Sequence, residues 1–413
     1  MKNTDSFRSD NSREEKMLQG KTVVLGVTGS IAAYKIANLT SMLTKLHADV
    51  HVLMTENATN FINPITFETL TNHKCLVDTF DRNFNYNIEH VALGEKADVV
   101  LVAPASANII AKMAHGIADD MLSTTLLACR CKKIVAPAMN TNMYDNPVVQ
   151  SNIQILRDFG MEVIEPDTGL LACKAVGRGK MPSEDTLLDY ILQEIQYEHD
   201  MTGKRVLVTA GATREALDPV RYITNHSTGK MGYALARTAA RRGAAVTLVS
   251  AARGLAAPLG VRMIPVESAQ DMYEAVRSQA DAHDIIVKAA AVADYTPAEI
   301  SDQKIKKKEG DTVLSLVRTK DILAWLGEHK REDQFVCGFS METENLVENS
   351  RAKLYKKKAD MIAANHLRQE GAGFGTDTNV VTLITEEDTE ELPILSKEET
   401  ARCIFDRILE KMG

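Results

Sequence analysis

Two stretches of this sequence begin in the same way, and they constrain the fold more than any other feature. Residues 20–27 and 203–210 are apolar runs that are typical of buried strands. Each run leads into a glycine-containing loop, at 28–30 and 211–213, and then into a helical pattern and a second apolar run. A strand, a helix and a strand in this order form a unit whose two strands lie parallel. The sequence therefore predicts an α/β protein with two Rossmann-like parallel sheets.

The helical patterns cover residues 31–46 and about 229–242, and each is followed by an apolar run, at 50–54 and 245–250. Further short apolar runs fit buried strands. These runs lie at 99–102, 134–136, 285–287 and 335–339. The sheets predicted from these runs are of the kind that binds ligands at the carboxyl ends of the strands.

The chain has 413 residues, which exceeds one ordinary core and predicts two or three domains. A polar stretch separates the two halves, so we expect domains at 21–190 and 203–413 with a linker at 191–202. Residues 1–20 are polar and mixed in charge, and they lack the apolar core of a signal peptide. We expect them to form a disordered tail.

The net charge of −8 gives no general attraction to nucleic acid or to an anionic membrane. No apolar run approaches the roughly 18–20 residues that span a bilayer. Six cysteines in so long a chain are sparse and form no disulfide framework, so reduced thiols in the cytoplasm are expected. These features favour a cytoplasmic protein that acts on small molecules.

Small and hydroxyl-bearing residues follow three of the predicted strands in the first half. Gly29 and Ser30 precede a helix, where backbone N–H groups can hold phosphate. Thr55 ends the second strand, and Ser106 and Asn108 follow the third. Small side chains there let a flat ring approach the backbone. A tight turn, a strand cap and a helix N-cap are the alternatives, and the spacing is not that of a dinucleotide fingerprint.

The segment Pro137–Tyr144 follows an apolar run and so lies at the carboxyl end of a strand. The Asn140 amide has donors and an acceptor that suit a carboxylate or amide ligand, although a plain turn is an alternative. Upstream lies His90, and downstream Cys173 lies on a segment with three glycines that suggests a mobile flap. Taken alone, such a histidine is commonly structural and such a cysteine is commonly inert.

Cationic and amide side chains stand out in the second half. Lys304 begins a cluster of lysines in one loop, and Lys353 and Lys357 are four apart, so they share one face of a helix. Asn225 lies in a polar turn, and Asp294 follows a predicted strand. Cations suit phosphate groups, and a solvated surface is the alternative. The second half has no P-loop motif.

Taken together, these motifs resemble a known family. The segment Gly29–Lys35 with His90, Pro137–Tyr144 and Cys173 resembles the homo-oligomeric flavin-containing cysteine decarboxylases. The segments 218–232, 289–295 and 304–307 resemble the ligase domain of the bifunctional phosphopantothenoylcysteine decarboxylase/phosphopantothenate–cysteine ligases of coenzyme A synthesis. The resemblance covers residues of about 20–413.

For the first half, which it implies is flavodoxin-like, the resemblance implies an FMN site and an oxidative decarboxylation. Oxidising the substrate thiol to a thioaldehyde supplies the electron sink that loss of CO2 requires. His90 is expected to act as the base, Asn140 to hold the substrate carboxylate and Cys173 to donate the final proton. The residues expected to bind FMN are Gly29, Ser30, Thr55, Ser106 and Asn108.

For the second half, the resemblance implies that 4'-phosphopantothenate is joined to cysteine through an acyl-cytidylate made from CTP with Mg2+. Asn225 is expected to stabilise that intermediate, and Lys304 to lie near the reacting phosphate. Mg2+ is expected to be held mainly through the CTP phosphates. The residues expected to bind CTP are Asp294, Lys304, Phe339, Lys353 and Lys357. A homo-oligomer is also implied, with decarboxylase trimers and ligase dimers, possibly as a dodecamer.

Two other functions remain as alternatives. A nicotinamide dehydrogenase would also have Rossmann-like halves, but the dinucleotide fingerprint and a Tyr-x-x-x-Lys pair are absent. A non-catalytic flavin-binding protein would share the first fold, since a fold does not fix a function. Cys173 and the ligase-type motifs argue against it.

Overall fold

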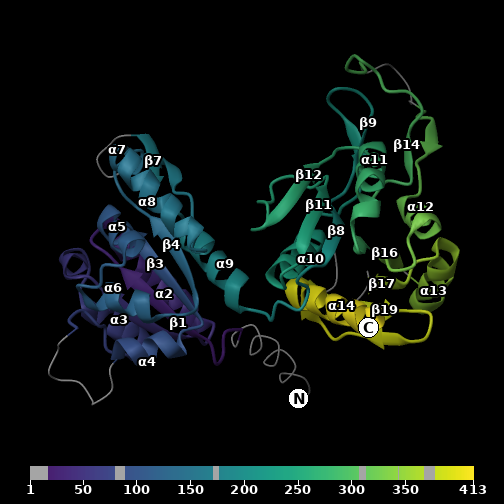
Figure 1. Ribbon diagram of the computed structural model, residues 1–413. Coiled ribbons are helices and arrows are strands. Elements are labelled where there is room, and N and C mark those ends of the chain that lie inside the picture. Colours follow the sequence, from purple (N-terminus) through teal and green to yellow (C-terminus); the bar gives the residue numbers. More distant parts are fainter. Residues whose placement is uncertain (1–16, 80–88, 171–175, 307–312, 343, 367–376) are drawn as a thin grey trace, which may run out of the picture. The chain divides into compact units, whose positions relative to one another are not determined.

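The computed structural model describes residues 17–79, 89–170, 176–306, 313–342, 344–366 and 377–413 (Figure 1). The chain divides into two compact units, Met1–Tyr197 and Glu198–Gly413, which are described separately below. Among the described residues, no helix combines the length and the apolar character that crossing a membrane requires.

The first unit is built on a five-stranded sheet in the order β2-β1-β3-β4-β5. Every neighbouring pair is parallel. This is the flavodoxin-like order. Successive strands are added on one side of β1 and then on the other, beginning with β3, and the ligand site lies at the carboxyl ends of β1 and β3. The strands are β1 (Thr22–Val27), β2 (Asp49–Met54), β3 (Val99–Ala105), β4 (Lys132–Pro137) and β5 (Glu162–Val163).

Helices cover both faces of this sheet because side chains of successive residues point to opposite faces and both sets are apolar. Val23 and Leu25 of β1 belong to the core beneath α2, α3 and α9, and Val24 belongs to the core beneath α4, α5, α6 and α8. The predicted helix at 31–46 is a short 3-10 turn, η1 (Ile31–Ala33), followed by α2. The helices are α2 (Tyr34–Lys45), α3 (Pro64–Thr71), α4 (Glu89–Lys96), α5 (Ala107–His115), α6 (Met121–Ala128), α7 (Thr141–Tyr144), α8 (Pro147–Asp158) and α9 (Glu184–Ile195), with a second 3-10 turn, η2 (Glu56–Asn60).

The second unit has an eight-stranded sheet in the order β12-β11-β8-β13-β16-β17-β19-β20. The first six strands are parallel and follow the Rossmann order. β19 runs antiparallel to β17, and β20 runs antiparallel to β19, which the apolar runs did not reveal. β19 and β20 are joined by a tight turn that closes at Thr385 and Asp388. The strands are β8 (Arg205–Ala210), β11 (Ala245–Ser250), β12 (Val261–Pro265), β13 (Ile285–Lys288), β16 (Phe335–Glu342), β17 (Met361–His366), β19 (Val381–Ile384) and β20 (Thr389–Glu391).

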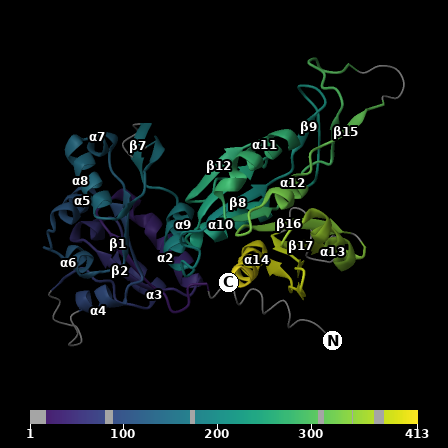
Figure 2. The ribbon, with the colours of Figure 1, turned by 45° about the vertical axis from the view of Figure 1, so that its right-hand side comes forward.

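Two layers of helices enclose this sheet as well. Helices α10 and α14 pack on one face with Val206 and Val208, and α11, α12 and α13 pack on the other with Leu207. Figure 2 shows α14 and α11 on opposite sides of the strands. The helices are α10 (Lys230–Arg241), α11 (Ala269–Gln279), α12 (Ile322–His329), α13 (Leu346–Lys357) and α14 (Lys397–Met412), with one 3-10 turn, η3 (Ala280–Ala282).

Within the described residues, four short antiparallel strand pairs lie outside the two main sheets. In the second unit, β9 and β14 lie at the same end of the sheet in Figure 1, near the functional edge described below. The pairs are β6 (Asp167–Leu170) with β7 (Val176–Lys180), β9 (Arg214–Ala216) with β10 (Tyr222–Thr224), β14 (Tyr295–Pro297) with β15 (Leu316–Arg318), and β18 (Thr378–Asn379) with β21 (Leu395–Ser396).

Aspartates hold the amino ends of neighbouring strands together. The residue just before β3, β13 and β17 is an aspartate in each case, and its carboxylate accepts an N–H from the first or second residue of the adjacent strand. These bonds are Thr22 N to Asp98 Oδ2 at 2.7 Å, Arg205 N to Asp284 Oδ2 at 2.9 Å, and Val336 N to Asp360 Oδ2 at 2.8 Å. The same device therefore closes the amino edge of both sheets.

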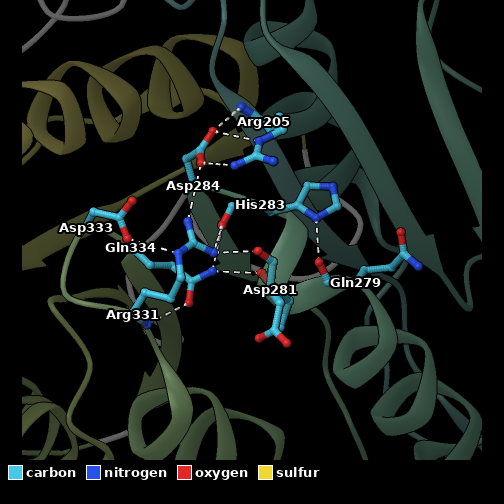
Figure 3. A network of polar contacts seen from close by, with 9 residues as sticks. Arg205, Gln279, Asp281, His283, Asp284, Arg331, Asp333 and Gln334 are labelled. Carbon is cyan, nitrogen blue, oxygen red and sulfur yellow. Dashed lines mark hydrogen bonds and ion pairs between the residues drawn. The ribbon is translucent and has the colours of Figure 1, made fainter.

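A network of side chains reinforces this edge in the second unit (Figure 3). Bonds from the Arg205 guanidinium hold the pKa of the Asp284 carboxyl below its usual value. Gln334 Nε2 donates to the Ala280 and His283 carbonyls at 2.8 and 2.6 Å, and Arg331 donates to the Asp281 carbonyl at 2.6 Å. The loop before β13 is thus fixed from several sides.

Two predicted boundaries differ from the structure. Residues 17–20 form a turn in which Leu18 is fully buried in the first core, so the order begins before residue 20, whereas residues 1–16 lie outside the described part. The predicted linker at 191–202 begins as helix, because α9 continues to Ile195 and buries Ile191 and Ile195. The apolar side chains on the last turn of α9 outweigh the polar neighbours from which the linker was predicted.

Candidate functional sites

In the first unit, the loops after β1 and β3 are joined by one threonine. The Thr28 hydroxyl donates to the Pro104 carbonyl at 2.6 Å and accepts from the Ser106 N–H at 3.0 Å. Thr28 is buried, and sequence reasoning did not single it out. The bond fixes both loops at the point where the strand order reverses, which is where this fold binds its ligand.

Gly29 and Ser30 lie directly after Thr28. A Cβ at Gly29 would come within 2.9 Å of the Asn57 Cβ, so only glycine fits this close approach. The Ser30 hydroxyl caps the η1 turn by accepting from the Ala32 N–H at 3.3 Å. The backbone here turns into a helix with its N–H groups leading, as an anion site requires.

Thr55, at the carboxyl end of β2, has the most telling side chain. Its hydroxyl is buried, and no hydrogen-bond partner for it is found within the described residues. A buried hydroxyl without a partner costs about 1–3 kcal/mol, so a ligand oxygen there would be favoured. Thr55 therefore offers an unused donor beside the loop of Gly29, which fits the phosphate of a flavin mononucleotide.

The third loop is less distinctive. The Ser106 hydroxyl caps α5 by accepting from the Ile109 N–H at 3.4 Å, which is the helix-cap alternative raised above. Asn108 is exposed on the first turn of the same helix. Ser106 therefore has a structural task at the predicted site, and Asn108 is open to solvent beside it.

The segment around Asn140 is held by the β6–β7 hairpin. The Asn140 side chain caps α7 by accepting from the Asn142 N–H at 2.8 Å, and the Met139 N–H donates to the Gly179 carbonyl at 3.1 Å. Gly179 has a φ of +128°, and a Cβ there would lie 2.2 Å from the Met139 carbonyl oxygen. β7 thus lies against the turn that carries Asn140, because only glycine permits so close an approach.

Charged contacts secure the same turn. The Arg178 guanidinium bonds Asp145 at 2.8 Å and lies over the Tyr144 ring. The Tyr144 hydroxyl donates to Glu165 at 2.8 Å, and burial together with this carboxylate raises the pKa of Tyr144 to about 12. The base of the predicted flap is therefore anchored, whereas its tip, with Cys173, lies outside the described residues.

A cavity of about 380 Å³ brings part of the predicted set together. It is lined by Ser30 and Asn140, with Tyr34, Leu170 and Lys180 among the other side chains. His90 does not line this cavity; it is a half-buried residue at the start of α4. Within one chain the structure therefore joins Ser30 to Asn140, and it leaves His90 apart from them.

In the second unit, the loops after β8 and β13 are joined across the corresponding reversal of strand order. Ala212 and Ala291 form a parallel bridge, and the Thr213 hydroxyl accepts from the Ala293 N–H at 3.0 Å. The Thr209 hydroxyl accepts from the Ala290 N–H at 3.1 Å. Threonines therefore fix the loops of this edge, as Thr28 does in the first unit.

A cavity of about 410 Å³ opens at this edge. Four of the residues predicted to bind a nucleotide line it: Asp294, Phe339, Lys353 and Lys357. The Lys353 ammonium donates to the Phe339 carbonyl at 3.2 Å, and Lys357 pairs with Asp321. Burial lowers the pKa of Lys353, since a charge is costly to hold away from water. The wall is thus rich in cations, which suits a polyphosphate.

Lys288 is a functional candidate that sequence reasoning missed. It ends β13, lines the same cavity and donates to the Ala290 carbonyl at 2.9 Å. Burial, with Lys353 nearby, lowers the pKa of Lys288 to about 8. A lysine at the end of an apolar run gave one available signal, because a core strand seldom ends on a charge without a partner.

Asn225 and Lys304 do not line this cavity. The Asn225 amide donates to the Ala291 carbonyl at 3.4 Å and so contacts the loop that carries Asp294. Lys304 is exposed, on a loop that is tied to Asp218 through the Ile305 N–H at 3.1 Å. Asp218 also pairs with Arg221, and Arg221 donates to the Ile305 carbonyl at 2.7 Å. The lysine loop is therefore anchored at its base, while Lys307 lies outside the described residues.

Within the described residues, each unit carries a ligand-type site at the carboxyl edge of its sheet, so the chain is a two-part α/β enzyme with a flavodoxin-like and a Rossmann-like half. Residues 11–196 match the family described as Flavoprotein, and residues 201–412 match the DNA/pantothenate metabolism flavoprotein C-terminal domain. The chain belongs to the family of coenzyme A biosynthesis bifunctional proteins, which combine a flavoprotein decarboxylase half with a ligase half.

The similarity to individual relatives extends over nearly the whole chain. The chain is 47% identical over 396 residues to the coenzyme A biosynthesis bifunctional protein CoaBC of Bacillus subtilis (strain 168), covering 95% of this chain and 97% of that protein. It is 39% identical over 397 residues to the protein of the same name from Escherichia coli (strain K12), covering 95% and 98%. A crystal structure of the C-terminal domain of a CoaBC protein is 45% identical, with a TM-score of 0.44, and covers 51% of this chain and 96% of that one.

Proposed function

We propose that the chain converts 4'-phosphopantothenate and cysteine to 4'-phosphopantetheine in two steps. Residues 203–413 join the two substrates using CTP and Mg2+, and residues 21–190 then decarboxylate the product with FMN. The observation that carries the proposal is the lysine-lined cavity at the carboxyl edge of the second sheet. Its cations match a polyphosphate co-substrate, which an amide ligase needs because hydroxide is a poor leaving group.

In the ligase step, the substrate carboxylate attacks the α-phosphate of CTP and pyrophosphate leaves, which gives an acyl-cytidylate. The cysteine amine then attacks the acyl carbon, and CMP leaves as the amide forms. Lys353 and Lys357 neutralise the phosphates, with Lys304 contributed by its loop. Asn225, beside the loop of Asp294, donates to the acyl group. Phe339 lines the same cavity against the nucleotide.

Mg2+ enters this step with the nucleotide. It is held mainly by the CTP phosphates, as is common for an ion that keeps several water ligands. Asp294 and Asp321 line the same cavity and supply carboxylate oxygens, the ligand type that Mg2+ prefers. These two side chains are the proposed protein contacts of the ion or of its waters.

In the decarboxylase step, Gly29, Ser30 and Thr55 would hold the FMN phosphate, and Ser106 and Asn108 would lie beside the flavin ring. When bound, FMN supplies the two-electron oxidation of the substrate thiol and the matching reduction. Asn140 orients the carboxylate that is lost, His90 takes the proton during oxidation and Cys173 returns one at the end. Because His90 lies apart from Asn140 within one chain, we propose that a second subunit completes the site.

The proposed assembly is a homo-oligomer, with trimers through the first unit and dimers through the second, possibly combined as a dodecamer. Exposed apolar side chains support such contacts, because large apolar side chains gathered on a surface are typical of interfaces. Beside the first cavity these are Ile31, Tyr34, Leu170 and Val176, and on the hairpins of the second unit they are Val220, Tyr222, Leu316 and Val317. A cytoplasmic location, expected from the sparse cysteines, stays a prediction.

The test is a product analysis with single omissions. The purified protein is incubated with 4'-phosphopantothenate, cysteine, CTP and Mg2+, and the products are identified by mass. We expect 4'-phosphopantetheine from the complete mixture, no amide without CTP, and accumulated 4'-phosphopantothenoylcysteine after the flavin has been removed. Full turnover by a colourless, flavin-free preparation would refute the first half of the proposal.

A further inference from the structure

A cluster of two histidines and an aspartate lies outside both proposed sites. Asp49 and His51 belong to the start of β2, and His73 follows α3. The His73 Nε2 lies 2.6 Å from Asp49 Oδ1, and the His51 Nε2 lies 3.3 Å from Asp49 Oδ2. One ligand atom from each residue lies within 4.8 Å of the other two. The cluster is at the amino end of β2, whereas Thr55 follows its carboxyl end.

Local structure holds the three side chains in place. Asp49 and His51 are two apart on a strand, so their side chains leave the same face. The segment that carries His73 is joined to β2 by two backbone bonds, Leu76 N to the Val52 carbonyl at 3.0 Å and Met54 N to the Leu76 carbonyl at 2.9 Å. All three residues thus stand on hydrogen-bonded backbone, which is the arrangement that a defined site requires.

The two imidazoles are arranged to act together. Their rings are stacked, with centroids 4.2 Å apart and planes inclined by 18°, and both Nε2 atoms face the same carboxylate. A neutral imidazole is the form that binds a metal ion.

We propose that Asp49, His51 and His73 bind a divalent transition-metal ion of the Zn2+ class. Two imidazole nitrogens and one carboxylate oxygen are the ligand types that Zn2+ takes, and three protein ligands leave a further position for water. Each ring would bind through Nε2 and keep its proton on Nδ1. Imidazole ligands disfavour Mg2+, which prefers oxygen.

Lys96 sets the strength of this site. Its ammonium pairs with Asp49 Oδ2, so it competes for the carboxylate that a metal ion would use. The Lys96 side chain is 55% exposed and can turn to solvent when the ion binds. A metal ion that binds here therefore replaces the Lys96 ammonium at the Asp49 carboxylate. Removing the charge of Lys96 should raise the affinity of the site for the metal ion.

The experiment is a calorimetric titration of the full-length chain with ZnCl2, with MgCl2 as the control ion. We expect one Zn2+ site, and we expect His73→Ala to lower its Zn2+ affinity by at least about 100-fold. Loss of a residue that only hydrogen-bonds a metal ligand already costs up to about 100-fold, and loss of the ligand itself costs more. His115→Ala, which removes an exposed histidine on the same unit, leaves that site unchanged. Lys96→Met strengthens it several-fold.

The outcomes separate the proposal from its alternatives. Equal Zn2+ binding by His73→Ala and by the unchanged chain would place the ion elsewhere and overturn the assignment. Binding of Mg2+ as tight as that of Zn2+ would do the same. If His73→Ala does not fold, as judged by circular dichroism, Lys96→Met decides: unchanged or weaker Zn2+ binding in that variant contradicts the proposal.

Discussion

The two units use the same edge of a similar sheet to build sites of opposite character. The first edge is formed by glycine and by side chains with hydroxyl and amide groups. Among these, the Thr55 hydroxyl is buried and has no hydrogen-bond partner within the described residues. At the second edge Lys288, Lys353 and Lys357 gather in one cavity. The sheet fixes where a ligand lies, whereas the loop residues decide whether hydroxyls and amides or lysines surround it.

The loops of both edges are nonetheless fixed by one device. Thr28 bonds across the reversal of strand order in the first sheet, and Thr209 and Thr213 do so in the second. A hydroxyl can accept and donate at once, so one small side chain can link two loops. Loop rigidity is therefore shared by the two sites, and charge is what separates them.

The largest expected effect is the loss of the first unit's activity while the activity of the second unit is unchanged. Cys173→Ser should slow formation of 4'-phosphopantetheine by about 100- to 10,000-fold, because a proton donor of suitable pKa is lost. An oxidised, decarboxylated intermediate should accumulate and be visible by mass. The same preparation should ligate 4'-phosphopantothenate and cysteine at the normal rate. Normal 4'-phosphopantetheine production would remove Cys173 from the reaction.

Asn225→Asp should have the opposite effect, with ligation impaired and decarboxylation unchanged. A carboxylate cannot donate a hydrogen bond to the acyl group, so amide formation should fall by about 100- to 1,000-fold. Acyl-cytidylate should build up and be detected by quenching and mass analysis. Decarboxylation of 4'-phosphopantothenoylcysteine supplied directly is the internal control and should not change. Unaltered amide formation would count against the proposed ligase site.

Lys288 sharpens the contrast through pH. Its pKa of about 8 keeps it charged below that pH, and the charge is lost as the pH rises through 8. The ligase kcat/KM for CTP should therefore fall above about pH 8. Lys288→Met should lower it by about 10- to 100-fold below pH 8 and abolish that decline, since a hydrogen bond to a charged group contributes about 1.5–3 kcal/mol.

Two control variants test the assignment to Lys288. Lys356→Met removes an exposed lysine from α13 and should leave the pH profile as it is. Lys288→Arg should keep a positive charge at all pH values measured and flatten the profile. A decline above pH 8 that persists in Lys288→Met would mean that another group titrates.

The smallest expected effect concerns Thr55. Thr55→Val removes the buried hydroxyl and should weaken FMN binding by about 5- to 30-fold, or about 1–2 kcal/mol. Fluorescence titration of the flavin-free chain measures the change. Thr55→Ser should restore most of the affinity. Thr59→Val removes a hydroxyl that already donates to the Glu56 carbonyl and should have no effect on FMN binding. Equal FMN affinity in Thr55→Val and the unchanged chain would contradict the phosphate assignment.

The sequence predicted much of the scaffold. The apolar runs fix both parallel sheets, and a four-residue spacing placed Lys353 and Lys357 on one helical face, as they are in α13. β19 was not among the predicted runs, and its direction could not have been predicted from one, because an apolar run has the same appearance in parallel and antiparallel strands. The two units divide at Tyr197 and Glu198, within the predicted linker at 191–202, but that segment begins as helix, since its polar residues hid the apolar stripe of α9.

Sites that depend on tertiary contacts escaped prediction. Lys288 was not singled out in the sequence, and the cavity it shares with Lys353 and Lys357 shows its environment. Asp49 and His73 are separated by an entire helix, so no local spacing connects them. The separation of His90 from Asn140 likewise depends on how the helices pack, which the sequence pattern does not encode.

The aspartates that precede β3, β13 and β17 have a consequence for how such a scaffold can change. These aspartates join neighbouring strands at the amino ends, away from the proposed ligand sites. They hold these strand pairs in register independently of the loops at the carboxyl ends. A sheet that is held together at its amino edge can accept different loops at its carboxyl edge and keep its strand pairing. One architecture could thus be remodelled twice within a single polypeptide, once toward redox chemistry and once toward acyl activation.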